Sequence, residues 1–223
     1  MKHTGIGILF DMDGVIVDSN PVHKQAIHQF CKEHGKVLTE TFFRKHISGR
    51  TNKEWIPHMF SDIGPEAIEK LSDEKERLFR SMFSPEDHLL RGLTEFLDAA
   101  QSAGMAMVVA TSAPSENAEF ILSRTGVRSY FDAVLTSSHV RTGKPHPDIY
   151  LKSAEAVEKV PGECVVIEDS LAGVEAAKSA GASVIGVTTS HIHEELSSCN
   201  LIINDFRELN IKELEKLVPD ILE

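Results

Sequence analysis

The sequence predicts an α/β protein in which a core built on a parallel β-sheet carries an inserted all-helical block. Three observations lead to this prediction. Residues 5–10 form an apolar run typical of a buried strand, residues 18–85 show helical periodicity without a strand pattern, and from residue 86 onward helical segments alternate with short apolar runs. Strands separated by helices of this length are typical of a parallel sheet with right-handed crossovers. Because the first strand must join that sheet, the helical block interrupts the core directly after it.

The helical block is expected to begin at Asn20 and Pro21, which have the pattern of an N-cap followed by proline at the first helical position. Gly35 is expected to close this helix. Thr51 and Glu54 form a capping-box pattern, which predicts the start of a later helix. Helices are expected at four places, by residue number: about 20–34, 40–47, 52–60 and 65–82.

The rest of the chain is predicted to alternate between helices and strands. Helices are expected, by residue number, near 93–102, over 114–124, after 147, over 171–180 and from about 208 onward. Strands are expected over 105–110, 133–135, 164–167, 183–187 and 201–203. The predicted domains are therefore an α/β core of residues 1–17 and 86–223, and a helical block of residues 18–85.

Composition limits the possible partners and location. With 223 residues, 41% hydrophobic and 26% charged, the chain is long enough for one large domain with an insertion. The formal net charge of −11 disfavours nucleic acid and anionic membrane surfaces as partners. No apolar run is long enough to cross a bilayer, and the first residues lack a signal-peptide hydrophobic region. The three cysteines lack metal-site spacing, so we expect reduced thiols in the cytoplasm. We also expect a monomer.

Asp11 and Asp13 follow the first predicted strand directly. Open α/β sheets bind ligands at the carboxyl ends of their strands. Side chains two residues apart in an extended segment share a face, so the two carboxylates can act as a nucleophile and a proton carrier. Their mutual repulsion implies a divalent cation. Asp-x-Asp-Gly is also an ordinary strand-to-turn sequence, so the motif alone leaves both interpretations open.

Three further strand ends carry polar groups that are expected to meet Asp11 at the same edge. Thr111 and Ser112 follow the second core strand, although taken alone these two residues favour a helix cap. Lys144 lies between a glycine and a proline, and Glu168 and Asp169 follow a strongly apolar strand. Phosphoryl transfer requires a nucleophile, a metal, and a hydroxyl, amides and a lysine around the equatorial oxygens. The sequence offers a residue for each of these roles, with the acidic residues as candidate metal ligands.

In combination these motifs resemble the haloacid dehalogenase superfamily, specifically its branch with a helical cap that contains β-phosphoglucomutase-like enzymes and sugar phosphatases. The resemblance covers essentially the whole chain and implies a Rossmann-like core with a mobile cap. It implies that Asp11 is the nucleophile that forms an aspartyl-phosphate and that Asp13 is the general acid and base. It also implies that Thr111, Ser112 and Lys144 bind the phosphoryl group. The implied Mg²⁺ ligands are Asp11, the backbone carbonyl of Asp13, and Asp169, with Glu168 ligating or supporting the metal.

Cap residues are expected to decide the substrate. His23, Arg50 and Asn52 are the candidate substrate contacts. In β-phosphoglucomutases the corresponding cap loop places a lysine and an arginine where this chain has Ser48 and Asn52, and an uncharged pair holds a second phosphate poorly. We therefore expect a magnesium-dependent phosphatase of a small phosphorylated metabolite, such as a sugar phosphate. A phosphosugar mutase of the β-phosphoglucomutase type is the alternative.

Overall fold

The computed structural model describes residues 5–47 and 50–218. The chain splits into two compact units, which we call the core unit (Met1–Asp18 with Pro85–Glu223) and the helical unit (Ser19–Ser84). The core unit contains the whole sheet, and the regular structure described in the helical unit is α-helical. That the helical unit serves as a cap over the active site stays a prediction.

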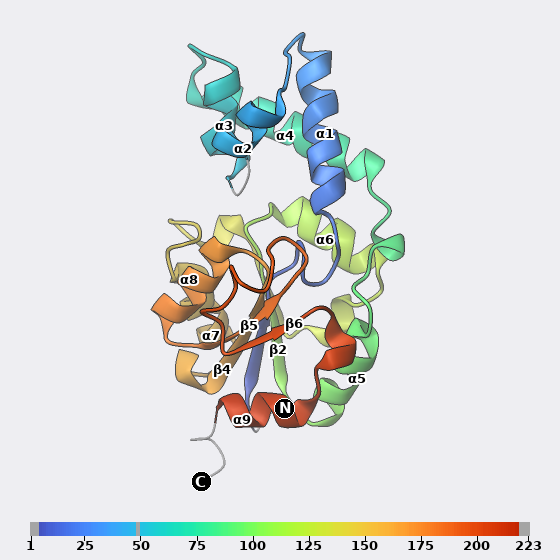
Figure 1. Ribbon diagram of the computed structural model, residues 1–223, viewed down its shortest axis with the longest axis vertical. Helices are drawn as coiled ribbons and strands as arrows, with labels where there is room; N and C mark the ends of the chain where they lie inside the picture. The colour runs from blue at the N-terminus through green and yellow to red at the C-terminus, as the bar shows by residue number, and fades with distance from the viewer. Residues whose placement is uncertain (1–4, 48–49, 219–223) are drawn as a thin grey trace. The chain divides into compact units, whose positions relative to one another are not determined.

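A six-stranded parallel sheet forms the centre of the core unit (Figure 1). The strand order is β3-β2-β1-β4-β5-β6. The strands are β1 (Gly7–Phe10), β2 (Ala106–Ala110), β3 (Ala133–Leu135), β4 (Cys164–Glu168), β5 (Ser183–Val187) and β6 (Leu201–Ile203). All residues of β1, β2 and β4 are buried, as expected for strands of a parallel sheet that is covered on both faces. This confirms the predicted fold class.

Alternation along β1 distributes its side chains between the two faces of the sheet. Leu9 belongs to a buried cluster that includes residues of α7 and α8. Phe10 points to the other face, where its ring centroid lies 5.5 Å from that of Phe131 and 6.2 Å from that of Phe206. The helices of the core unit are α5 (Leu93–Ser102), α6 (Ser115–Arg124), α7 (Asp148–Ala156), α8 (Leu171–Ala180) and α9 (Ile211–Leu217).

Short 3₁₀ turns connect several of these elements. They are η1 (Pro85–Asp87), η2 (Arg128–Tyr130), η3 (Ser137–His139), η4 (Pro161–Glu163) and η5 (Phe206–Glu208). The C-terminal helix α9 begins at Ile211, three residues after the expected start near 208, and the 3₁₀ turn η5 precedes it as a separate element. Asn210 causes the break, since its side chain accepts a hydrogen bond from the Glu213 amide and so caps a new helix.

The helical unit consists of α1 (Asn20–Glu33), α2 (Glu40–His46), α3 (Asn52–Met59) and α4 (Pro65–Met82). Its core contains Phe30 and Trp55, whose ring centroids are 6.1 Å apart in an edge-to-face arrangement. Asn20 is the first residue of α1, and Ser19 occupies the N-cap position that the sequence assigned to Asn20. Pro21 fits in the first turn because amides there have no intrahelical partner.

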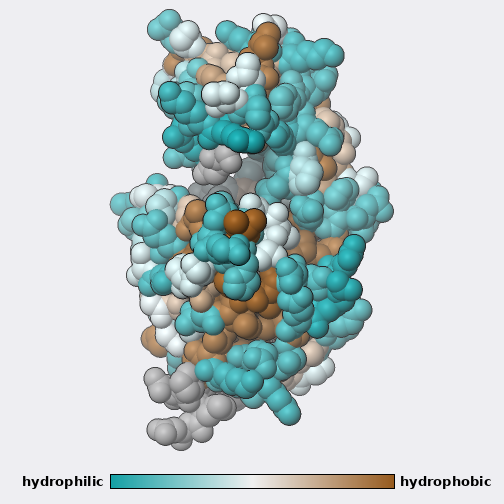
Figure 2. Space-filling model, in the orientation of Figure 1, coloured by the Kyte–Doolittle hydropathy of each residue, from teal (hydrophilic) through white to brown (hydrophobic). Residues whose placement is uncertain are grey.

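The surface of the core unit is not uniformly polar. Figure 2 shows hydrophobic residues exposed around β6, the edge strand whose Leu201 and Ile202 are only partly buried. None of the helices in the described part of the chain is long and apolar enough to cross a membrane.

Candidate active site

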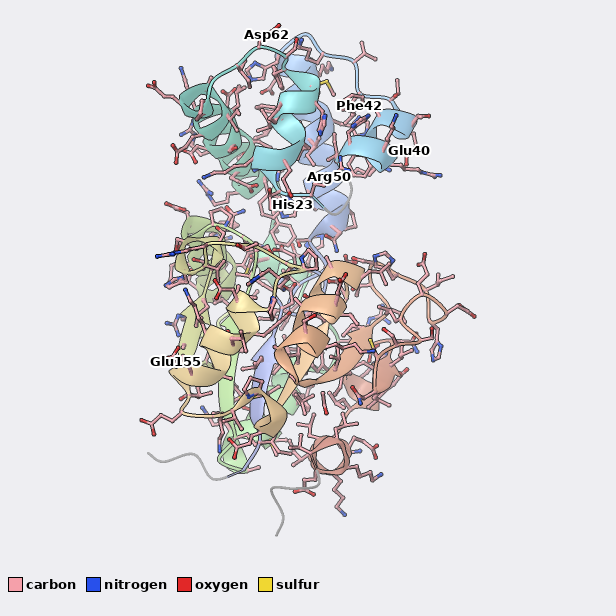
Figure 3. The ribbon with its side chains drawn as sticks, turned by 90° about the vertical axis from the view of Figure 1, so that its left-hand side faces the viewer. His23, Glu40, Phe42, Arg50, Asp62 and Glu155 are labelled. Carbon is pink, nitrogen blue, oxygen red and sulfur yellow. The ribbon has the colours of Figure 1, made fainter. Side chains whose placement is uncertain are left out.

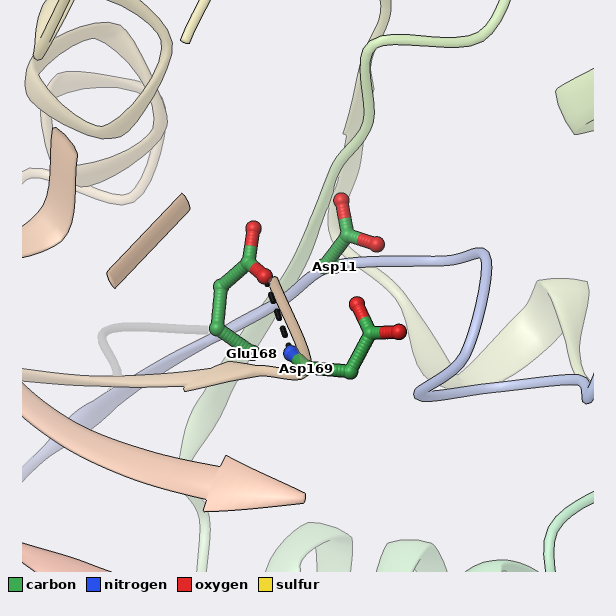
Figure 4. A group of neighbouring side chains, drawn as sticks. All are labelled: Asp11, Glu168 and Asp169. Atoms are coloured by element: carbon green, nitrogen blue, oxygen red, sulfur yellow. Dashed lines mark hydrogen bonds between the residues drawn. The ribbon is translucent and has the colours of Figure 1, made fainter. Parts of the chain in front are cut away.

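Three acidic side chains meet at the carboxyl edge of the sheet. Asp11 follows β1, Glu168 is the last residue of β4, and Asp169 follows it. The pairing of Phe10 with Ile167 and a 2.9 Å hydrogen bond from the Asp11 amide to the Ile167 carbonyl hold the two strand ends side by side. One carboxylate oxygen from each of the three acids lies within 4.8 Å of the others, and all three residues are buried (Figure 4).

Lys144 joins this cluster from a loop that follows β3. Its Nζ lies 2.5 Å from Oδ1 of Asp11 and 2.6 Å from Oε1 of Glu168. A third hydrogen bond, 3.1 Å long, goes to the carbonyl of Ala110 at the end of β2. An ammonium group has three hydrogens to donate, and these contacts supply an acceptor for each. The lysine therefore connects the ends of β1, β2 and β4.

Glu168 accepts hydrogen bonds on both carboxylate oxygens. Oε1 accepts from Lys144 and, at 2.9 Å, from the hydroxyl of Tyr150. Oε2 accepts from the amides of Asp169 and Ser170, each at 2.9 Å, and from the Ser170 hydroxyl at 3.0 Å. Such donors already satisfy the lone pairs of this carboxylate.

Gly173 makes room for the Glu168 carboxylate. A Cβ at position 173 would lie 1.7 Å from Oε1 of Glu168, which no packing can accommodate. The sequence analysis missed both Gly173 and Tyr150. Gly173 lies on α8 and Tyr150 lies on α7. Each is next to Glu168 because its helix packs on the sheet, and the sequence motifs do not indicate that packing.

Burial shapes the ionisation of these groups. Burial raises the pKa of Asp11 well above its usual value, although Lys144 opposes that shift. For Glu168 burial acts in the same direction, but Lys144 and the hydrogen bonds from Ser170 and Tyr150 outweigh it and lower the pKa. Burial and the neighbouring charge of Glu168 raise the pKa of Asp169 to about 7. A nearby cation would stabilise the ionised form of such a buried carboxylate.

The donor set fits Mg²⁺. Asp11 and Asp169 offer carboxylate oxygens, which are hard ligands of the kind magnesium prefers. Asp13 lies in the turn after β1, where its backbone bridges to Val17. The negative charge of Asp13 contributes to the raised pKa of both Asp11 and Asp169. A divalent cation at this edge would compensate the charge of these carboxylates.

Thr111 and Ser112 follow β2 at the same edge. Thr111 is buried, and its amide donates a 3.0 Å hydrogen bond to the Leu135 carbonyl. Its hydroxyl accepts a 3.0 Å bond from the Ala113 amide and still carries its own hydrogen for donation. The local turn contact and a phosphate-binding role are therefore compatible. Ser112 is exposed.

Two hydroxyls after β5 were also missed by the sequence analysis. Ser190 Oγ donates a short hydrogen bond to Oδ2 of Asp169, and Thr189 Oγ1 lies 3.3 Å from the same oxygen. These residues follow a strand that carries no acid, and isolated serines and threonines are too common in turns to signal a site.

Two of the candidate substrate contacts, His23 and Asn52, lie within a polar network of the helical unit. Nδ1 of His23 is 2.9 Å from Nζ of Lys75, and the His23 ring stacks on Phe79 with centroids 3.6 Å apart. Asn52 donates to Glu76 at 2.6 Å and accepts from the Trp55 indole at 3.0 Å.

Arg50 is exposed in the segment before α3, and Figure 3 labels it together with His23. Ser48 lies outside the described residues. The two amide contacts of Asn52 give it a structural role inside the helical unit. Contacts of His23, Arg50 and Asn52 with a substrate stay predictions.

Residues 7–181 match the haloacid dehalogenase-like hydrolase family, and the chain belongs to this family. The predicted resemblance is thereby confirmed.

Several related proteins are named as phosphatases. A phosphorylated carbohydrates phosphatase of Thermotoga maritima is 35% identical over 78% of this chain and 81% of its own length. A fructose-1-phosphate phosphatase of Escherichia coli is 32% identical over 81% of this chain and 95% of its own length. A HAD hydrolase of family IA, variant 3, from Entamoeba histolytica has a TM-score of 0.89 at 30% identity, covering 96% of this chain and 99% of that one. The chain is an enzyme of the phosphoric monoester hydrolase class.

Proposed function

We propose that the protein is a magnesium-dependent phosphatase that hydrolyses a small phosphorylated carbohydrate through an aspartyl-phosphate on Asp11. The observation that carries the proposal is the surroundings of Asp11 at the sheet edge. Its carboxylate is buried, lies 2.5 Å from the Lys144 ammonium and within 4.8 Å of an Asp169 oxygen. A nucleophile, a cation for the phosphoryl oxygens and a further metal ligand are thus next to one another.

The first half of the reaction forms the intermediate. A carboxylate oxygen of Asp11 attacks phosphorus while the bond from phosphorus to the ester oxygen breaks. The leaving oxygen takes a proton from Asp13, so that the alcohol leaves neutral. Lys144 and Thr111 bind the equatorial oxygens, with Ser112 contributing at the same turn. Asp11, Asp169 and the Asp13 carbonyl would hold Mg²⁺, which supplies positive charge to the phosphoryl oxygens when bound.

The second half regenerates the enzyme. Asp13 takes a proton from water as the water oxygen attacks phosphorus, and the bond from phosphorus to Asp11 breaks to release inorganic phosphate. Glu168 is assigned a supporting role in this scheme. Its oxygens already accept hydrogen bonds from Lys144, Tyr150 and Ser170, so it holds the lysine in place rather than ligating the metal.

The substrate class rests on the relatives and on the helical unit. Two relatives are named as phosphatases of phosphorylated sugars. A β-phosphoglucomutase of Bacillus subtilis is also related, at 27% identity, which keeps the mutase as the second candidate. Asn52 favours the phosphatase, because a neutral amide bonded to Glu76 and Trp55 offers no positive charge to a second phosphate.

A screen of phosphorylated metabolites for release of inorganic phosphate tests this proposal. The unmodified protein is expected to release phosphate from one or more sugar phosphates with Mg²⁺ and to stop in excess chelator. Asp11→Asn is nearly isosteric and is expected to fold but to lose turnover. Substantial turnover by Asp11→Asn, or full activity of the unmodified protein in chelator, would contradict the proposal.

A further inference from the structure

The hydroxyl pair Thr189–Ser190 follows β5 at the same sheet edge as the acidic cluster. β5 pairs directly with β4, with Glu168 opposite Gly186, so the segment after β5 reaches the residue after β4. Ser190 donates to Oδ2 of Asp169, and Thr189 lies 3.3 Å from that oxygen. Both hydroxyls therefore contact the carboxylate to which we assign the metal.

Thr189 makes a second, shorter contact with the turn after β1. Its Oγ1 lies 2.6 Å from the carbonyl oxygen of Gly14. A hydroxyl has one hydrogen to donate, so the shorter contact takes it and Ser190 is the main donor to Asp169. Gly14 follows Asp13 directly and has φ 87°, and its amide closes the turn on the Val17 carbonyl at 2.7 Å. Thr189 therefore holds the turn that carries Asp13.

These contacts span three neighbouring strands. In the sheet, β4 lies between β1 and β5, so Thr189 reaches from the end of β5 past Asp169 to the end of β1. A hydrogen bond to one oxygen of a carboxylate fixes the plane of the group and so the direction of its other oxygen. Partners of this kind commonly change metal affinity by about 10–100-fold.

We infer that Thr189 and Ser190 are positioning residues of the proposed enzyme, with Ser190 orienting Asp169 for Mg²⁺ and Thr189 fixing the turn of Asp13. This inference rests on the proposed function, because it assigns the two hydroxyls to the metal ligand and the acid of that reaction. Neither hydroxyl is assigned a contact with substrate.

Mg²⁺ binding to the metal-free full chain, measured by titration calorimetry without substrate, tests the role of Ser190. Ser190→Ala is expected to raise the Mg²⁺ dissociation constant about tenfold, and Ser190→Thr, which keeps the hydroxyl, to restore much of the affinity. Thr188→Val is the matched control. The Thr188 hydroxyl donates to Asn204 at 2.9 Å, so its loss is expected to leave Mg²⁺ binding unchanged.

Kinetics at saturating Mg²⁺ test the role of Thr189. Thr189→Val, which keeps the shape of the side chain, is expected to lower kcat/KM for alkyl phosphates more than for p-nitrophenyl phosphate, and Thr189→Ser to recover kcat/KM. Thermal melting of the metal-free variants checks that each is folded. Normal Mg²⁺ affinity in folded Ser190→Ala would overturn the role of Ser190, and a normal kcat/KM for alkyl phosphates in folded Thr189→Val would overturn the role of Thr189; either result leaves the proposed function standing. Absence of Mg²⁺ binding by the unmodified protein would instead overturn the metal-dependent function.

Discussion

Asp13 is the residue whose assigned role depends most on the chemistry of the substrate. An acid that protonates the leaving oxygen matters when the leaving group is a poor one, such as a sugar alkoxide. Asp13→Asn is therefore expected to slow alkyl phosphates by roughly 10²–10⁴-fold and p-nitrophenyl phosphate much less. The value of kcat/KM for both substrates measures this, because it reports the reaction only up to release of the leaving group and so excludes the second half, in which Asp13 acts as base for either substrate. Equal losses on the two would rule out the acid role.

Gly173 provides a second test at the scale of single residues. A methyl group at this position would overlap the Glu168 carboxylate and push it away from Lys144. Gly173→Ala is expected to lower the free energy of unfolding by about 1–3 kcal/mol, as overpacking does, and to reduce activity. Gly162→Ala is the control, because a Cβ there meets no atom within 4 Å. Equal stability of the two variants in urea unfolding would contradict this explanation.

Residue motifs predicted part of the site. Asp11, Lys144, Glu168 and Asp169 lie together, as expected from the common edge at which parallel strands end. The carboxylate of Glu168 is fully buried at this edge. Lys144 compensates its charge and the Tyr150 hydroxyl donates a hydrogen bond to it, and a buried partner such as Tyr150 on a separate helix leaves no pattern in the sequence.

At the scale of elements, apolar runs predicted the strands because a buried parallel strand is apolar on both faces. β5 and β6 have the predicted bounds, and β2 begins one residue later than expected, at Ala106. The first residues of helices, which depend on capping, were less predictable than the strands. Both Ser19 and Asn20 are residue types that favour the N-cap, and Ser19 occupies that position of α1 without a capping hydrogen bond from its side chain.

The raised pKa of Asp169, which follows β4 directly, predicts that the stability of the protein depends on pH. The pKa of Asp169 is about 7 in the folded protein and near 3.8 when unperturbed. Between these values the native state binds more protons than the unfolded state, so stability falls as pH rises. Without metal, the free energy of unfolding is therefore expected to drop from pH 5 to pH 8, by on the order of a few kcal/mol.

Urea unfolding in chelator at the two pH values measures this drop. Asp169→Asn has no charge to bury and is expected to reduce the difference, with Asp11, whose pKa burial also raises, contributing what remains. Saturating Mg²⁺ is expected to restore the stability of the unmodified protein at pH 8, because the cation favours the ionised carboxylate. A metal-free protein as stable at pH 8 as at pH 5 would contradict the raised pKa.

At the scale of the whole molecule, the helical unit is proposed to decide between hydrolysis and transfer back to the sugar. Glucose 1-phosphate with a sugar bisphosphate primer is expected to give free phosphate. Ser48→Lys combined with Asn52→Arg is expected to strengthen binding of a second phosphate and to increase transfer. The double variant is also expected to be less stable, because replacing Asn52 removes its hydrogen bonds to Glu76 and Trp55.

Phosphate release and glucose 6-phosphate formation, measured in parallel, separate the two activities. Efficient conversion of β-glucose 1-phosphate to glucose 6-phosphate by the unmodified protein would replace the phosphatase with the mutase. The fold, the proposed nucleophile and the proposed metal ligands would be unaffected by that result.

The covalent role of Asp11 is the central claim, and trapping of the intermediate tests it most directly. Borohydride reduces an aspartyl-phosphate to homoserine, which peptide mass spectrometry can locate. Protein is mixed with Mg²⁺ and a substrate that it hydrolyses, and is then treated with borohydride. This protein is expected to carry homoserine at position 11. Protein without substrate, and Asp11→Asn with substrate, are expected to carry none. Homoserine at another aspartate, or none during active turnover, would contradict the account.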